Sequence, residues 1–197
     1  MTTIILATNN PHKIRELKTL LVGVPGEIVA LADVESPPVL REDGSTFREN
    51  ALQKARAVFE ATGHASVADD SGLEVFYLNG RPGVFSARYA GPEATDERNN
   101  AKLLAEMRGV PPRRRRAQFH AVTAFVDGQT EIVTEGVCLG KLGESPRGTN
   151  GFGYDPLFIP DDFDRTYAEL SAEEKNQISH RSKAVARMRE ALTQHLR

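Results

Sequence analysis

The segment VADDSGLEVFYLNGRPGVFSARYAG, residues 67–91, combines the signal of a buried strand with two adjacent acids. The apolar run 65–68 leads into Asp69 and Asp70. Neighbouring side chains of a strand point to opposite faces, so these two acids are expected to do different jobs if the strand continues. Paired acids at the end of a strand can hold a divalent cation against a phosphate. Because Ser and Gly follow them, a plain turn is the alternative.

Length and composition point to an ordinary globular protein. A chain of 197 residues suggests one domain, folded as two lobes. A net charge of -2 gives no argument for nucleic acid or an anionic membrane as a partner. Cys138 is the only cysteine, so no internal disulfide forms and a reducing compartment fits. The polar N-terminus does not resemble a signal peptide, and no apolar run has membrane-spanning length, so we expect a cytoplasmic protein.

A strand followed directly by a helix is predicted at the N-terminus. Residues 3–7 are apolar and β-branched, Asn10 is a suitable N-cap, and Pro11 is a favourable first helical residue. Free N–H groups at such a helix start bind anions, and Lys13 adds a full positive charge. The alternative is a plain strand–helix connection with a solvated lysine. The segment is not a P-loop, because the glycine spacing is absent.

The rest of the pattern predicts alternating strands and helices. We expect a strand at 27–31, a helix from Thr46 to Gly63, a helix at 95–108, a hairpin of 118–126 and 131–139, a short strand at 157–159, and C-terminal helices after Ser171. Glu42 precedes a helix start, where an acid is also favoured by the helix dipole. Asn50 and Lys54 are four residues apart and share a helix face.

Two further segments attract attention. Residues 113–116 are four arginines, but they lack interleaved aromatics, so a solvated loop is predicted and not a nucleic-acid site. Residues 143–156 form a long Gly/Pro-rich loop that carries Phe152, Tyr154 and Asp155. Loops positioned by a rigid scaffold often carry function, although these aromatics could simply pack onto the core. His180 on its own is an ordinary surface or cap residue.

Taken together, five segments in order resemble the inosine/xanthosine triphosphate pyrophosphatases, which hydrolyse non-standard purine nucleoside triphosphates. The matching segments are ATNNPHKIRELKTLL, EDGSTFRENALQKA, ADDSGLEV with GRPGVFSARYAG, GTNGFGYDPLF and AELSAEEKNQISHR. The resemblance runs over nearly the whole chain. It implies an elongated, two-lobed α/β fold with a long curved mixed β-sheet, flanking helices and a central nucleotide cleft. It also implies that residues 1–197 form a single nucleoside triphosphate pyrophosphatase domain, usually a homodimer.

The resemblance further implies a reaction and its residues. ITP, dITP or XTP reacts with water to give the monophosphate and diphosphate with Mg2+, which clears these nucleotides from the pool. The triphosphate would be held by Thr8, Asn9, Asn10, Pro11, His12 and Lys13. Glu42 and Asp70 would bind the metal, and Asp70 would accept the proton. The nucleotide would touch Ser71, and its nucleoside end would be lined by Phe152, Gly153, Tyr154, Asp155, Lys175, His180 and Arg181. Lys54 and Arg88 would add phosphate contacts.

The chemistry of these residue types agrees with this assignment. A triphosphate needs cationic side chains and a hard, oxygen-bound cation, and Phe152 can stack on a purine. Donors from Arg181, His180 or a backbone N–H would donate hydrogen bonds to the 6-oxo group of hypoxanthine or xanthine, and such a site can reject adenine by roughly 10⁴-fold. The alternatives are a related pyrophosphatase for other nucleotides, a nucleotide- or RNA-binding module without turnover, and a structural oligomer. The base preference and the direct or metal-mediated role of Asp70 stay open.

Overall fold

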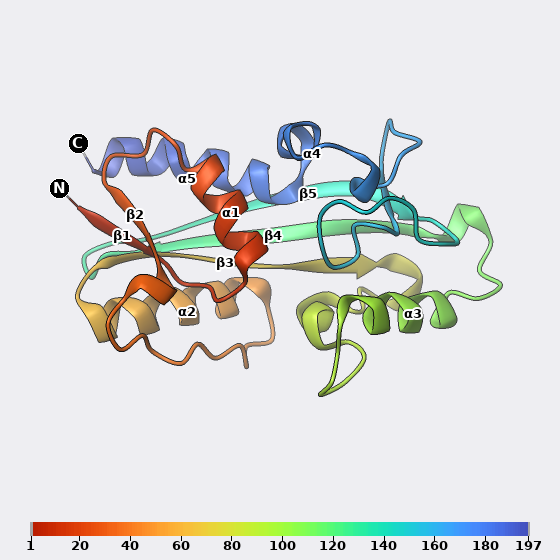
Figure 1. The fold of residues 1–197 in the computed structure, drawn as a ribbon, viewed down its shortest axis with the longest axis horizontal. Helices are drawn as coiled ribbons and strands as arrows, with labels where there is room; N and C mark the ends of the chain where they lie inside the picture. The colour runs from red at the N-terminus through yellow and green to blue at the C-terminus, as the bar shows by residue number, and fades with distance from the viewer. Residues whose placement is uncertain (1, 197) are drawn as a thin grey trace. The chain divides into compact units, whose positions relative to one another are not determined.

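A single mixed β-sheet with helices on both sides organises the computed structural model, which describes residues 2–196 (Figure 1). In this part of the chain the strands are β1 (Thr3–Leu6), β2 (Glu27–Ala30), β3 (Ala65–Val75), β4 (Arg116–Val126), β5 (Glu131–Leu142) and β6 (Phe158–Pro160). The α-helices are α1 (Pro11–Leu20), α2 (Phe47–Thr62), α3 (Asp96–Glu106), α4 (Ala172–Ile178) and α5 (His180–His195). Short 3-10 helices are η1 (Leu31–Asp33), η2 (Phe76–Leu78), η3 (Gly83–Arg88), η4 (Pro112–Arg114) and η5 (Tyr167–Glu169).

The strand order is β2-β1-β3-β4-β5-β6, which confirms the predicted α/β class with a mixed sheet. β1 pairs in parallel with both β2 and β3, whereas β5 and β6 are antiparallel. Parallel neighbours need crossover connections, and α1 and α2 provide them. No helix of the described residues combines the length and apolar character that a membrane crossing requires.

The chain divides into two compact units. The first contains the residues up to Asp70, Ala121–Gly136 and the residues from Arg181 on, and the second contains Ser71–His120 and Val137–His180. Strands β3, β4 and β5 therefore contribute residues to both units. Two of the boundaries fall between covalent neighbours that the sequence singles out, Asp70 with Ser71 and His180 with Arg181.

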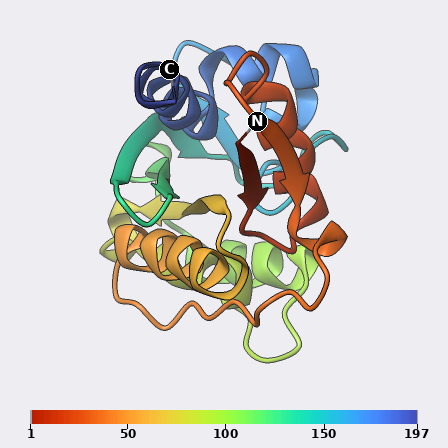
Figure 2. The same cartoon turned by 90° about the vertical axis from the view of Figure 1, so that its left-hand side faces the viewer.

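One apolar cluster of the first unit lies between the strands and helices α1 and α5. Leu17 of α1 and Met188 of α5 pack with Ile4 of β1 and Val67 of β3 in one buried cluster. Figures 1 and 2 show α1 and α5 on this side of the strands and α2 on the other. Helices α1 and α5 thus cover the sheet with their apolar faces, as amphipathic helices do.

The second unit has a core built mainly from aromatic and long aliphatic side chains. Leu103 of α3 packs in a buried cluster with Phe119, Phe158 and Tyr167, and the rings of Phe119 and Phe158 meet edge to face with centroids 4.8 Å apart. Cys138 belongs to the same cluster and is 5% exposed. Within this unit α3 and α4 lie on opposite sides of the strands (Figure 1).

The helix-start signals are confirmed. The Asn10 side chain accepts hydrogen bonds from the N–H groups of His12 and Lys13, and Pro11 is the first helical residue. Thr46 caps α2 in the same way. In contrast, the plain turn considered for Asp69 to Gly72 is wrong, because β3 continues through these residues to Val75. A strand gives the two acids different partners, as its alternation predicts.

The solvated loop predicted for the arginine run is wrong in part. Arg113 and Arg114 are exposed, but Arg115 is 4% exposed. Its guanidinium donates hydrogen bonds to the carbonyl groups of Leu142, Met107 and Gly143, at 3.1, 3.0 and 2.7 Å. This one side chain satisfies the ends of several segments, which is a structural role that composition alone does not reveal.

Candidate active site

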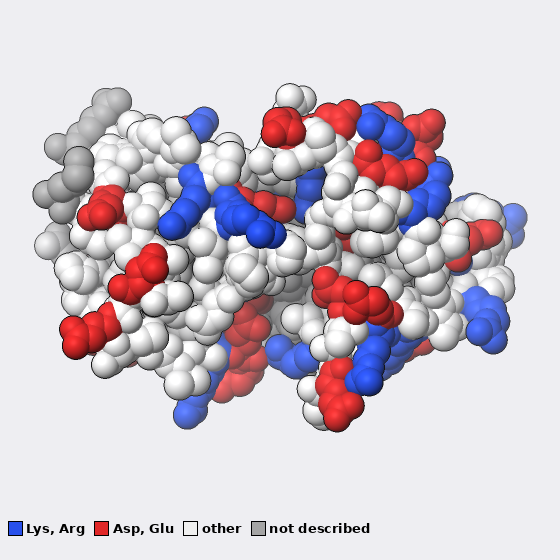
Figure 3. Space-filling view, viewed as in Figure 1, with Lys and Arg blue, Asp and Glu red and all other residues white. Residues whose placement is uncertain are grey.

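The start of α1 presents amide donors and a lysine. Asn10 caps the helix, and its own N–H donates to Thr8 Oγ1 at 3.2 Å. Lys13 Nζ lies 3.0 Å from Asp69 Oδ2 and 3.3 Å from the Asp69 carbonyl oxygen. Figure 3 shows Lys and Arg side chains gathered on the surface over α1. The remaining residues of this predicted segment are exposed (Asn9, Pro11) or half-buried (His12). Together these groups can bind an anion.

Beneath Lys13 lies a fully buried ion pair between Asp69 of β3 and Arg181 of α5. Arg181 Nε and Nη2 bond to the two Asp69 oxygens at 3.2 and 3.1 Å, and Nη1 bonds to Glu16 at 2.5 Å. Burial would raise the pKa of Asp69, but the charges of Arg181 and Lys13 outweigh it and hold the pKa well below its usual range. The carboxylate is therefore ionised and fixes Lys13. Arg181, predicted among the nucleoside residues, has all three guanidinium nitrogens on carboxylates.

On the other face of β3, Asp70 meets α2. Its Oδ1 lies 3.0 Å from Lys54 Nζ, and its Oδ2 accepts from Asn50 Nδ2 at 3.0 Å. Lys54 Nζ also donates to Glu42 at 2.5 Å and to the Asp69 carbonyl at 2.9 Å. Burial raises the pKa of Asp70 above its usual value, although Lys54 and Lys13 act in the opposite direction. Burial alone would lower the pKa of Lys54, but the carboxylates of Asp70 and Glu42 keep it raised.

The carboxylates of Glu42 and Asp70 therefore lie close together, because both bond to the Lys54 ammonium. The described residues contain no cluster of three or more His, Cys, Asp or Glu side chains suited to a metal. Mg2+ does not need such a cluster, because it commonly takes one or two carboxylates and completes its shell with water and substrate phosphates. Glu42 and Asp70 fit that donor set, and a soft or nitrogen-preferring metal would not suit them.

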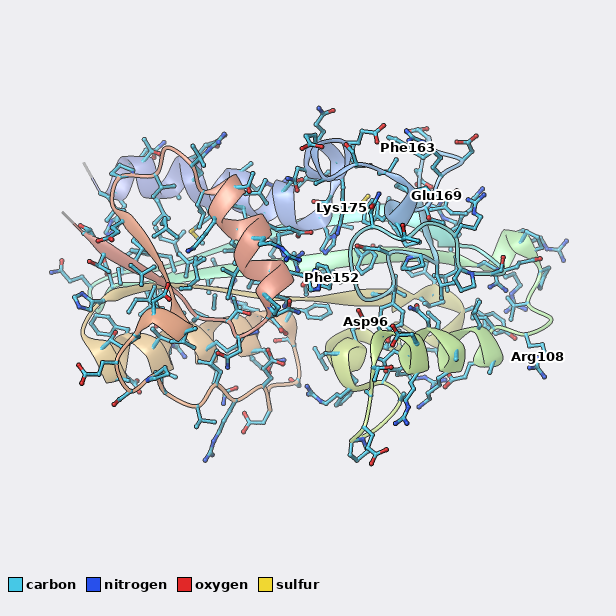
Figure 4. The ribbon with its side chains drawn as sticks, in the orientation of Figure 1. Asp96, Arg108, Phe152, Phe163, Glu169 and Lys175 are labelled. Carbon is cyan, nitrogen blue, oxygen red and sulfur yellow. The ribbon has the colours of Figure 1, made fainter. Side chains whose placement is uncertain are left out.

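In the second unit, the loop 151–155 is closed on itself by Asp155. Its Oδ2 accepts from the Phe152 N–H at 3.0 Å and from Lys175 Nζ at 2.7 Å. The ammonium of Lys175 lies 5.0 Å from the centroid of the Phe152 ring (Figure 4). A Cβ at Gly151 would come within 2.0 Å of the Asp155 carboxylate, and the φ of Gly151 is +76°. Only glycine suits this turn.

Tyr154 and His180 are buried in the second unit. The Tyr154 hydroxyl donates to the Ser86 carbonyl at 2.8 Å, and burial raises its pKa. His180 stacks on Phe119 with centroids 4.6 Å apart, so the surface or cap position considered for His180 is wrong. Ser71 is half-buried on β3, and the Arg88 guanidinium lies over the Phe85 ring at 5.1 Å.

The structure thus assembles the predicted residues in two groups. The first unit brings together Lys13, Glu42, Lys54, Asp70 and Arg181, and the second brings together Phe152, Asp155 and Lys175. Sequence reasoning assigned no role to Asn50 or Glu16. The spacing of Asn50 from Lys54 was a usable signal. Glu16 gave none, because its partner Arg181 is 165 residues away.

Comparisons with known proteins cover nearly the whole chain. A model of the Ham1 family matches residues 4–191. A dITP/XTP pyrophosphatase of Thermoanaerobacter pseudethanolicus is 47% identical over 193 residues, which are 98% of each chain. Among solved structures, a Ham1 protein from Coxiella burnetii aligns with a TM-score of 0.90 and 41% identity, over 98% of this chain and 100% of that one. A nucleoside-triphosphatase / dITP/XTP pyrophosphatase from Mycobacterium abscessus aligns with a TM-score of 0.78 and 45% identity, over 95% and 98%.

Proposed function

Because the chain belongs to the Ham1 family, we propose that it hydrolyses the non-standard purine nucleotides ITP, dITP and XTP to the monophosphate and diphosphate. The resemblance identified from the sequence is thereby confirmed. One observation carries the chemistry: Lys13 and Lys54 both donate to the Asp69 carbonyl, next to the Asp70 carboxylate. The free amide groups at the start of α1, together with two lysines and two acids, suit a triphosphate that is attacked by water.

The first unit would supply the phosphate end. The amide groups at the start of α1 and the Lys13 ammonium would bind phosphate oxygens. Asp70 would accept a proton from the attacking water, and its raised pKa makes it a better base near neutral pH. Glu42 and Asp70 would hold Mg2+, which when bound neutralises phosphate charge and makes a bound water more acidic.

The second unit would supply the nucleoside end. The half-buried Phe152 ring would stack on the purine, with the Lys175 ammonium beside it. The Arg181 nitrogens bond to Asp69 and Glu16, so we expect His180 or a backbone N–H to recognise the 6-oxo group. Guanine shares that group, and its 2-amino group would be rejected by shape or by an unpaired contact.

We also propose the setting in which this activity operates. Both units would form one pyrophosphatase domain, because the matched family model spans 4–191. The protein would act as a homodimer in the cytoplasm, where a lone cysteine stays reduced. The net charge of -2 gives no support for nucleic acid or membrane partners.

The test is diphosphate release from ITP, XTP, dATP, GTP and dTTP, with Mg2+ and with EDTA. We expect release from ITP and XTP alone, dependent on Mg2+ and lost in Asp70→Asn. Asp161→Asn makes the same chemical change at an exposed ion pair and should leave the rate unchanged. Equal rates on all five nucleotides would refute the base selectivity. No release from any of them would refute the activity and favour a binding module without turnover.

A further inference from the structure

Two side chains of helix α3 hydrogen-bond to the backbone of Gly153, in the loop that carries Phe152. Asp96 Oδ2 accepts a hydrogen bond from the Gly153 N–H at 2.6 Å, and Asn100 Nδ2 donates to the Gly153 carbonyl at 2.8 Å. Asp96 and Asn100 are four residues apart and so share one face of α3. Both the backbone N–H and the backbone carbonyl of Gly153 are thereby bonded to side chains of the same helix.

These bonds complete the fixation of Phe152 itself. The Phe152 N–H donates to the Asp155 carboxylate at 3.0 Å, and its carbonyl accepts from the Asp155 N–H at 3.2 Å. All four backbone polar groups of Phe152 and Gly153 are therefore bonded. Gly151 and Gly153 have φ values of +76° and +63°, so the ring sits between two flexible residues and depends on these bonds for its direction. Figure 4 shows Phe152 between Asp96 and Lys175.

The helix that provides the two hydrogen bonds to Gly153 is itself well anchored. The Thr95 side chain caps α3, and Leu103 of α3 is fully buried in the core of the second unit. Asn100 is 8% exposed, and in the described part of the chain its Oδ1 is buried with no hydrogen-bond partner. A half-satisfied buried amide destabilises a fold, whereas an aliphatic residue would not. The hydrogen bond from Asn100 to the Gly153 carbonyl explains why a polar side chain occupies this buried position.

We propose that Asp96 and Asn100 are positioning residues for nucleobase recognition, acting through the backbone of Gly153. The inference rests on the proposed function, in which Phe152 stacks on the purine. Stacking depends on the ring's position, and a loop with more conformations must be ordered again each time a nucleotide binds. Loss of these hydrogen bonds to Gly153 should therefore weaken base recognition and leave the chemistry of the first unit intact.

The first test is steady-state hydrolysis of ITP by Asp96→Ala, Asp96→Asn and Asn100→Leu. We expect KM to rise about fivefold for Asp96→Ala and Asn100→Leu, the change typical of one lost hydrogen bond, with kcat within about twofold. Asp96→Asn should keep KM at the wild-type value, because its amide oxygen can still accept the hydrogen bond from the Gly153 N–H. Glu97→Ala is the matched control, since it removes an acid from the same helical turn, and its KM should equal that of the wild type.

The second test needs no activity. Amide hydrogen exchange at Gly153 in the nucleotide-free protein should be about fivefold faster in Asp96→Ala and normal in Asp96→Asn. An unchanged exchange rate, or an unchanged KM in a hydrolysing enzyme, would overturn the inference, and so would an equal effect of Glu97→Ala. If the wild type hydrolyses no purine nucleotide while exchange at Gly153 responds as expected, Asp96 still orders the loop but the proposed function is wrong. Asp96 is exposed, so its variants fold even if Asn100→Leu does not.

Discussion

Replacing Arg181 with methionine tests the buried network under Lys13 most directly. The side chain of Arg181 is 2% exposed and that of Asp69 is 0% exposed, and two hydrogen bonds of 3.1 and 3.2 Å join them. Arg181→Met keeps most of the volume and removes the charge. Asp69 then keeps Lys13 as a cationic partner at 3.0 Å, while Glu16 loses the guanidinium bond.

The expected loss of stability is large. Removing one partner of a buried ion pair typically costs about 3–5 kcal/mol, because the other charge stays desolvated. At about 2–4 °C per kcal/mol for a chain of this size, the melting temperature should fall by roughly 6–20 °C. The double variant Asp69→Asn with Arg181→Met removes both charges and should recover part of the loss, which gives a coupling energy of at least about 1 kcal/mol.

Thermal unfolding followed by circular dichroism measures both quantities. The control is Arg56→Met, which breaks a two-bond ion pair with Glu131 in the same unit whose side chains are 49% and 42% exposed. The loss of unfolding free energy in Arg56→Met should stay below about 1 kcal/mol. If Arg181→Met cost no more than Arg56→Met, or if the effects of the two single variants at Asp69 and Arg181 were additive, the buried network would not stabilise the fold.

Three further outcomes follow from the same geometry. Burial raises the pKa of Asp70, so in the protein without Mg2+ this carboxyl group should titrate above about pH 4 when followed by NMR, and higher still in Lys54→Met; a titration at or below about pH 4 contradicts the raised pKa. The lowered pKa of Asp69 stabilises the fold above its unfolded pKa of about 3.9. The stability deficit of Asp69→Asn should thus be constant from neutral pH to about pH 5 and shrink as the pH falls below about 4, measured by urea unfolding. Gly151→Ala should lose more stability than Gly153→Ala, because only the former brings a Cβ within 4 Å of a neighbour, and equal losses would show that φ strain alone decides.

Local chemistry made much of the fold predictable. Asn10 with Pro11 fixed one helix start, and the threonine before α2 fixed another, because caps satisfy backbone N–H groups within a few residues. The alternation of a strand gave Asp69 and Asp70 different partners. These features depend on sequence neighbours alone, so they need no knowledge of tertiary structure.

The burial of charged side chains was not predictable in the same way. Arg115 looks like its exposed neighbours in composition, yet it bonds to carbonyls of residues up to 28 positions away. Arg181 reaches Glu16 across 165 residues, and no periodic pattern encodes that pairing. Asp96 is an ordinary first-turn acid until the loop 151–155 is placed beside it. Such contacts arise only when distant segments are brought together by the fold.

The burial of Cys138 offers a way to observe the second unit in motion. It is the only thiol in the sequence, and it lies in the aromatic core with 5% exposure. An alkylating reagent reacts with the thiolate and needs access to it, so modification requires a transient opening of that core. The rate of Cys138 alkylation in the native protein therefore reports how often the core of the second unit opens. A nucleotide that stabilises the closed core will slow the modification.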